Sequence, residues 1–247
     1  MFFETMRDLK LWLKIHKKHN FDGGSQGECY RIGNKVYKIF IQFIEDEEED
    51  MIVYNRDEIL RFSSLVNKTY IFPIDVIIVG DLVVGYITDY VDAISLYKIN
   101  PLGVNLDLLE KDLKIVYSDI GIISDKGICS YDVLYNIMYG MCGFKIIDTI
   151  EYTYSQIDYT DLYRINVKNF TNGIKLFLID GYFDQFVSSN RVLYDMYSES
   201  SVDIMMFIRE FRKKLSENEG YNVTRLSECS KSISIKRVRS FKYIREI

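Results

Sequence analysis

The sequence predicts an α+β fold with a β-rich N-terminal third and a mainly helical remainder. Short strand-like runs separated by glycine turns gather before residue 91. Helical spacing dominates the later part, and strand signals vanish after residue 160. With 247 residues, the chain is long enough for one large domain or two small lobes with a sizeable core.

The first 65 residues predict a helix, a glycine-rich turn, two strands and a second helix. Residues 4–18 carry Met6, Leu9 and Leu13 at helical spacing, which indicates an amphipathic helix rather than a signal peptide. The stretch FDGGSQGECYRIGNKVYKIF, residues 21–40, is typical of a glycine-rich turn and two strands around Gly33 and Asn34. An acidic run, EDEEED at residues 45–50, precedes a helical stretch that extends to Leu65.

Two further hairpins are predicted, each with a helix after it. The runs TYIFPIDVIIV and LVVGYITDYV flank Gly80-Asp81 and predict one hairpin. Residues 105–126 have helical spacing, and a second hairpin follows around Gly140 to Gly143. Residues 161–180 and 200–217 predict the last two helices.

Composition excludes several classes of protein. The net charge of −5 argues against general nucleic-acid affinity, which needs a basic footprint. The four cysteines form no CxxC pair, which indicates a reduced, cytoplasmic protein. The most apolar stretch, residues 70–91, contains three aspartates, so no membrane span is expected. The two histidines, His16 and His19, both lie near the N-terminal helix, so hydrolysis by a Ser-His or Cys-His pair is not expected.

The segment ICSYDVLYNIMYGMCGFKIIDTIEY, residues 128–152, places Asp132, Asn136 and Asp148 within apolar runs. Burying such groups without partners costs several kcal/mol, so their presence needs a reason. Hard oxygen ligands such as Asn and Asp suit Mg²⁺. The segment is therefore a candidate functional site.

Other motifs stand in a matching order along the chain: GGSQGECY, VYKIF, NRDEILRFSSL and ITDYVDAISL. Together with the segment above, they resemble the protein kinase-like superfamily, in the manner of a divergent bacterial-type Ser/Thr kinase. The resemblance covers about residues 21–180. It implies a two-lobed fold, with a β-rich N-lobe over residues 1–90 and a mainly helical C-lobe over residues 91–247.

The resemblance also implies roles for single residues. Lys38 matches the phosphate-binding lysine, and Glu58 matches the helix-borne glutamate that pairs with it. Asp132 matches the catalytic base, and Asn136 and Asp148 match the metal ligands. The implied cofactors are ATP and Mg²⁺. The remaining residues implied to contact the nucleotide lie in the glycine-rich loop and the hinge: Gly24, Ser25, Gln26, Gly27, Asp89, Tyr90 and Val91.

The chain also departs from the family pattern. Asp22 replaces the first glycine of the loop, and Asp132 and Asn136 are four residues apart where the family has five. Ser130 and Tyr131 replace the usual histidine and arginine, so control by phosphorylation loses its anchor. Thr-Ile follows Asp148 in place of Phe-Gly, and no Ala-Pro-Glu landmark follows, which implies a weak platform for a peptide substrate.

These observations predict an ATP- and Mg²⁺-dependent phosphotransferase that acts on a protein hydroxyl. Two alternatives remain open: a pseudokinase that serves as an interaction scaffold, and a small-molecule kinase of the aminoglycoside or choline type. The acidic run is interpreted as a solvated helix start, or else as a docking site for a basic partner. The tail from Lys231 has six Lys or Arg against one Glu, and is interpreted as a solvated terminus or a site for an anionic partner such as RNA.

Overall fold

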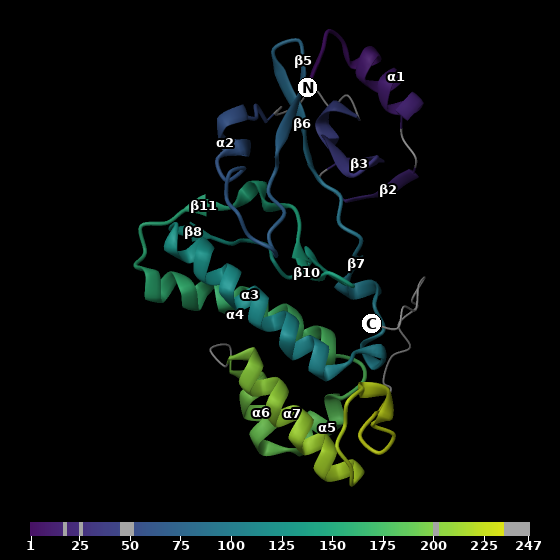
Figure 1. Cartoon of the computed structure of the whole chain (residues 1–247), viewed down its shortest axis with the longest axis vertical. Coiled ribbons are helices and arrows are strands. Elements are labelled where there is room, and N and C mark those ends of the chain that lie inside the picture. Colours follow the sequence, from purple (N-terminus) through teal and green to yellow (C-terminus); the bar gives the residue numbers. More distant parts are fainter. Residues whose placement is uncertain (17–18, 25–26, 45–51, 200–202, 235–247) are drawn as a thin grey trace. The chain divides into compact units, whose positions relative to one another are not determined.

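The computed structural model describes residues 1–16, 19–24, 27–44, 52–199 and 203–234 (Figure 1). The chain forms two compact units. The first comprises Met1–Val66, Ile71–Val91 and Asp148–Ile150, and the second comprises Asn67–Tyr70, Asp92–Ile147 and Glu151–Ile247. The acidic run, Ser25, Gln26 and the tail from residue 235 lie outside the described residues.

A six-stranded sheet in the order β1-β5-β6-β4-β3-β2 forms the centre of the first unit. Strand β1 pairs with β5 in parallel, and the other pairs are antiparallel. The strands are β1 (Phe2–Phe3), β2 (His19–Gly24), β3 (Gly27–Ile32), β4 (Lys35–Phe40), β5 (Asp75–Val79) and β6 (Leu82–Asp89).

The two predicted hairpins of the first unit are confirmed. Gly33 between β3 and β4 has φ 62°, and Gly80 between β5 and β6 has φ 57°. Both turns require the left-handed backbone conformation that glycine adopts without steric cost. The glycines therefore explain where each pair of strands reverses direction.

The two faces of this sheet pack against different partners, because successive side chains of a strand point to opposite faces. On one face, Leu9 and Leu13 of α1 (Met6–His16) pack with Ile39, Ile77 and Val84. On the other face, the buried residues are Phe40, Ile59, Val76 and Tyr86. Ile59 belongs to α2 (Arg56–Leu60), which is shorter than the predicted helix through Leu65.

The second unit is mainly helical. Figure 1 shows α3 and α4 running side by side, with α5, α6 and α7 grouped together. Apolar residues at helical spacing on α3, such as Leu109, Leu113 and Val116, are fully buried. The helices are α3 (Leu106–Asp125), α4 (Tyr159–Ile179), α5 (Asp184–Ser189), α6 (Arg191–Ser198) and α7 (Ile204–Glu219), with 3-10 turns at Leu96–Lys98, Pro101–Gly103 and Leu226–Glu228.

Two small sheets complete the second unit. One has the order β10-β9-β7 and the other pairs β11 with β8. The predicted hairpin around Gly140 to Gly143 is confirmed as β9 and β10. The strands are β7 (Ile94–Ser95), β8 (Ile128–Cys129), β9 (Ile137–Gly140), β10 (Gly143–Ile146) and β11 (Thr153–Tyr154).

The predicted α+β class is confirmed, with a β-rich first unit and a mainly helical second unit. The helices predicted at residues 105–126, 161–180 and 200–217 correspond to α3, α4 and α7, whereas α5 and α6 were not predicted. All four cysteines are free thiols. None of the described helices is long and apolar enough to cross a membrane.

Candidate functional site

Lys38 and Asp148 form the centre of the candidate site in the first unit. Lys38 lies on β4 and is only 8% exposed. Its Nζ is 2.7 Å from both carboxylate oxygens of Asp148, which lies 110 residues later in the sequence. Two motifs recognised separately in the sequence therefore meet in one buried ion pair.

Tyr86 is a further partner of Asp148 and was not predicted. Its hydroxyl donates a hydrogen bond to Oδ1 of Asp148 at 2.8 Å. Burial, with further contributions from Asp148, raises the pKa of Tyr86 well above its ordinary value of 10.0. The hydroxyl therefore stays protonated and able to donate at neutral pH.

The residues after Asp148 hold its segment within the first unit. Thr149 donates its hydroxyl to the carbonyl oxygen of Ile71 at 3.0 Å. Arg61 donates from Nη2 to the carbonyl oxygen of Ile150 at 2.8 Å. These two bonds explain why the segment Asp148–Ile150 belongs to the first unit although its neighbours in the sequence belong to the second.

Asp132 and Asn136 come together in the second unit. Nδ2 of Asn136 donates to the backbone carbonyl of Asp132 at 2.9 Å and to its carboxylate Oδ2 at 3.3 Å. The shortened loop thus closes on itself and keeps the two side chains in contact. Asp132 is exposed, as are Tyr131 and Tyr135 on either side of it.

Asp132 and Asp148 share an unusual backbone conformation. Their φ angles are 45° and 58°, and they are the only non-glycine residues with positive φ in the described part of the chain. Such a conformation is uncommon for any residue with a side chain, and strained backbone gathers at functional sites. Both candidate aspartates are therefore distinguished by their geometry as well as by their motifs.

A buried asparagine on α4 anchors the loop that precedes Asp132. Oδ1 of Asn166 accepts hydrogen bonds from the backbone N and the hydroxyl of Ser130, both at 2.8 Å. Its Nδ2 donates to the hydroxyl of Ser124 and the carbonyl of Ile128, both at 2.9 Å. Asn169 donates to the carbonyl of Ser130 at 2.8 Å. No local sequence pattern indicates this anchor, because its partners lie far apart along the chain.

The structure does not bring Glu58 to Lys38. Glu58 is exposed, and the ion pair of Lys38 is with Asp148. The short helix α2 buries Ile59 against the sheet. Adjacent residues of a helix do not share a face, so burying Ile59 turns Glu58 to solvent.

Gly27 of the predicted phosphate loop has a structural reason to be glycine. It belongs to β3 and pairs with Gly24 of β2. A Cβ atom on Gly27 would lie 2.1 Å from the carbonyl oxygen of Ile39. Glycine at this position therefore permits the close approach of β3 and β4.

The three predicted hinge residues end the segment Ile71–Val91 of the first unit. Asp89 forms an ion pair with Lys35 at 2.6 Å, and the guanidinium of Arg31 lies 3.5 Å from the ring centroid of Tyr90. Val91, the last residue before the second unit, is half-buried. Their contacts to a nucleotide remain a prediction.

The chemistry of the candidate ligands fits a hard cation. The Asp148 carboxylate already binds a cation, the Lys38 ammonium, through both oxygens. Asn136 uses its Nδ2 for Asp132, which leaves its side-chain carbonyl oxygen as a ligand atom. Within the described residues, no three His, Cys, Asp or Glu side chains gather as a metal site. The side chains of Asp148 and Asn136 therefore each offer an oxygen atom of the kind that Mg²⁺ prefers.

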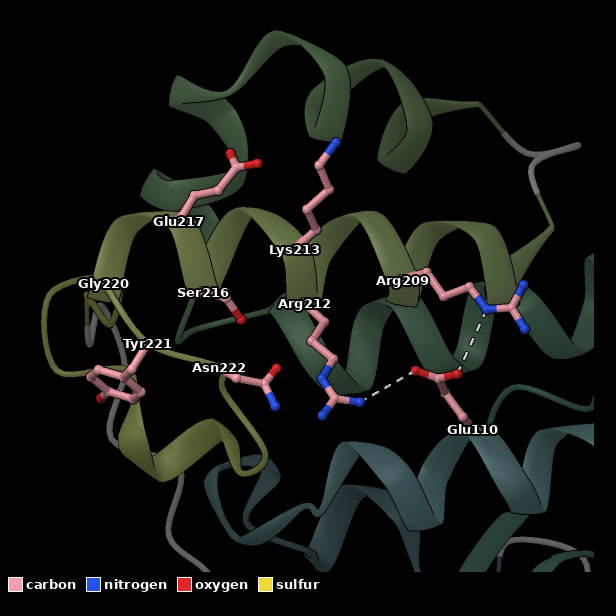
Figure 2. Close-up of a pocket in the computed structure, with 9 residues that line it drawn as sticks. All are labelled: Glu110, Arg209, Arg212, Lys213, Ser216, Glu217, Gly220, Tyr221 and Asn222. Atoms are coloured by element: carbon pink, nitrogen blue, oxygen red, sulfur yellow. Dashed lines mark ion pairs between the residues drawn. The ribbon is translucent and has the colours of Figure 1, made fainter.

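A separate pocket of about 520 Å³ lies in the second unit (Figure 2). Figure 2 shows Arg209 and Arg212 both reaching toward Glu110, at 3.6 and 3.7 Å. Arg212 also pairs with Asp107 at 2.6 Å. The pocket contains none of the predicted site residues, and its arginines already have acidic partners.

Comparisons with known proteins give different results for sequence and for structure. No family model matches the sequence, and no curated protein matches it. Among solved structures, the chain is similar to the PknI kinase domain of Mycobacterium tuberculosis, with 12% sequence identity and a TM-score of 0.49. The match covers 80% of this chain and 94% of that one. Because the identity and the TM-score are low, we base the functional proposal on the residues of this chain.

Proposed function

We propose that the chain is an ATP- and Mg²⁺-dependent phosphotransferase of the protein kinase-like superfamily that transfers the γ-phosphate to a protein hydroxyl. The observation that carries the proposal is the buried pair of Lys38 with Asp148. The contact of Asp132 with Asn136 and the strained backbone of both aspartates support it. A reduced, cytoplasmic environment and a nucleotide as partner belong to the same proposal.

The proposed roles follow from the chemistry of each group. Lys38 would release Asp148 and hold the ATP phosphates with its ammonium group. Asp148 and Asn136 would hold Mg²⁺, which neutralises the charge on the phosphates. Asp132 would orient the acceptor hydroxyl and accept its proton. Positioning and electrostatic stabilisation supply nearly all of the catalysis in phosphoryl transfer. These four side chains provide the types of chemical group that such catalysis requires.

Nucleotide binding provides the first test. ATP with Mg²⁺ at about 100 times its Kd should raise the melting temperature by about 5–10 °C, because a ligand that binds only the folded state stabilises it. Asp148→Asn should abolish the part that depends on Mg²⁺. Asparagine is the matched replacement, since it tolerates positive φ better than alanine. Asp81→Asn, in the exposed turn before β6, serves as the control. A melting temperature that does not change on addition of ATP and Mg²⁺ at millimolar concentrations would favour a scaffold that binds no nucleotide.

Transfer is tested with labelled ATP. The wild type should label itself or hydrolyse ATP slowly, and Asp132→Asn and Asp148→Asn should lower the rate by orders of magnitude without unfolding the protein. Equal labelling of the wild type and both variants would contradict the proposal that the chain is a phosphotransferase. The absence of label in all three proteins, with cell extract supplied as acceptor, would contradict it as well. Either result would favour the alternative of a pseudokinase that serves as an interaction scaffold.

One observation favours a small-molecule acceptor as the second candidate. Asp158 caps α4, which begins at Tyr159, so the segment between Asp148 and α4 is short. It contains only a 3-10 turn (Thr149–Glu151) and β11. This leaves little chain to build a peptide platform. Labelled ATP offered separately with small hydroxyl compounds and with proteins would distinguish the two acceptors.

A further inference from the structure

One row of side chains crosses four strands on the sheet face that carries Lys38. Cys29 of β3 stands opposite Lys38, Lys38 stands opposite Tyr86 of β6, and Tyr86 stands opposite Val76 of β5. Directly opposed residues of an antiparallel pair share a face. Tyr86 is therefore placed beside Lys38 by the register of the sheet itself.

Tyr86 is held firmly in this row. It is 3% exposed and packs with Phe40, Ile59 and Val76. The ring of Phe40 lies 5.9 Å from its own, measured between centroids. The hydroxyl of this fixed ring donates to Oδ1 of Asp148 at 2.8 Å.

Asp148 thus has two donors of different kinds. Lys38 is charged and contacts both carboxylate oxygens, whereas Tyr86 is neutral and contacts Oδ1 alone. If Lys38 binds the ATP phosphates, it leaves the carboxylate. Tyr86 carries no charge that phosphates would attract, and its buried ring is packed too closely to move with Lys38. Its hydrogen bond to Oδ1 therefore persists.

We propose that Tyr86 is a positioning residue that keeps the Asp148 carboxylate oriented for Mg²⁺ when Lys38 turns to the phosphates. The inference rests on the proposed function and adds to it a residue that no kinase-like motif of this sequence marks. Oδ2 of Asp148 would then be available as a ligand for the metal, because the Tyr86 hydroxyl bonds to Oδ1. Partners of this kind typically change metal affinity by about 10- to 100-fold when they are removed.

The test compares Tyr86→Phe with Tyr139→Phe. Tyr139 is a matched control in the second unit: it is 1% exposed, and its hydroxyl donates to Oδ2 of Asp112 at 2.9 Å. Phenylalanine keeps the ring in both variants and removes only the hydroxyl. Calorimetric ATP binding is measured over a Mg²⁺ titration and again in EDTA, and urea unfolding checks the fold of each protein.

Tyr86→Phe should raise the Mg²⁺ concentration needed for half-maximal ATP affinity by about 10-fold. Its ATP affinity in EDTA should stay within about 2-fold of the wild type, because Lys38 is intact. Tyr139→Phe should lose stability but keep the Mg²⁺ dependence of the wild type. Wild-type Mg²⁺ dependence in Tyr86→Phe, or the same shift in both variants, would overturn the inference. A wild type whose ATP binding ignores Mg²⁺ would overturn the proposed function as well.

Discussion

At the scale of single residues, the pair of Lys38 and Asp148 is the most informative feature. Their side chains are 10% and 19% exposed, so water screens the pair only in part. Breaking a buried pair by removing one partner is costly, because the remaining charge loses its compensation. The stability of this chain therefore depends on a pair that the proposed function must open.

We expect Lys38→Met to lower the free energy of unfolding by about 3 kcal/mol, since it leaves the largely buried carboxylate of Asp148 without a cation. Lys38→Met combined with Asp148→Asn should cost about 1–2 kcal/mol less than the sum of the single changes. Urea unfolding of the four proteins measures this coupling.

Lys35→Met is the control for this cycle, because Lys35 lies on the same strand. Its pair with Asp89 is 2.6 Å long but far more exposed, with side chains 33% and 57% accessible. Surface pairs contribute about 0–1 kcal/mol, so Lys35→Met should cost less than 1 kcal/mol. Equal losses in the two lysine variants would contradict a special role for the buried pair.

Sequence reasoning found the residues whose chemistry shows in a local motif. Lys38, Asp132, Asn136 and Asp148 each interrupt an apolar run, which is visible without a structure. Tyr86 was missed, because a tyrosine in a strand is ordinary until its distant partner is known. Glu58 was expected at Lys38 because the length and face of α2 are not readable from a short charged stretch.

At the scale of elements, α4 carries the anchor of the loop before Asp132. Asn166 satisfies four groups at once: the N and hydroxyl of Ser130, the hydroxyl of Ser124 and the carbonyl of Ile128. It is fully buried, so no water can replace these bonds easily. The helix thereby fixes the position of Ser130 and, through it, the start of the loop.

Asn166→Ala should lower the free energy of unfolding by about 3 kcal/mol, because it leaves several buried polar groups unsatisfied. The amide of Ser130 should exchange its hydrogen much faster in this variant, since it loses its acceptor. Hydrogen exchange and urea unfolding measure the two effects. Asn169→Ala, which removes one bond to the carbonyl of Ser130, should cost about 1 kcal/mol and leave the Ser130 amide protected. Equal exchange in the two variants would argue against the anchor.

The sequence predicted most elements because their periods and turns are local. The hairpins with Gly33 and Gly80, and helices α3, α4 and α7, follow from apolar spacing and glycine positions. Helices α5 and α6 are only six and eight residues long, too short to establish a helical period. The allocation of Asn67–Tyr70 and Asp148–Ile150 between the units depends on long-range contacts, which no local pattern encodes.

At the scale of the whole molecule, buried tyrosine and cysteine side chains make the free energy of unfolding decrease at alkaline pH. Burial raises the pKa of Tyr86, Tyr117 and Tyr139 above 10.0, and raises the pKa of Cys229 from 9.0 to about 12. A group with a raised pKa contributes stability that is fully present below its unfolded pKa and lost as pH rises toward the folded value. Burial lowers the pKa of Lys175, so this group makes the free energy of unfolding rise with pH.

The free energy of unfolding should therefore fall as pH rises from 9.0, first through Cys229 and then, above 10.0, through the tyrosines. Each group can contribute a slope of up to about 1.4 kcal/mol per pH unit. Urea unfolding at pH 7.5, 9 and 10 measures the fall. Cys229→Ala should make the loss between pH 9 and 10 smaller by about 1 kcal/mol, and an unchanged slope would contradict this assignment.

The late position of Asp148–Ile150 in the sequence affects how the first unit folds during translation. The rest of the first unit is complete in sequence at Val91, but Lys38 has no counter-ion until Asp148 has been made. Translation at about 5–20 residues per second takes roughly 3–11 s to cover this interval. During that time the sheet carries a desolvated ammonium and lacks Ile150, which packs against the cluster that contains Phe40 and Tyr86. The first unit therefore cannot finish folding until Asp148–Ile150 has been synthesised, after the 56 residues Asp92–Ile147 of the second unit.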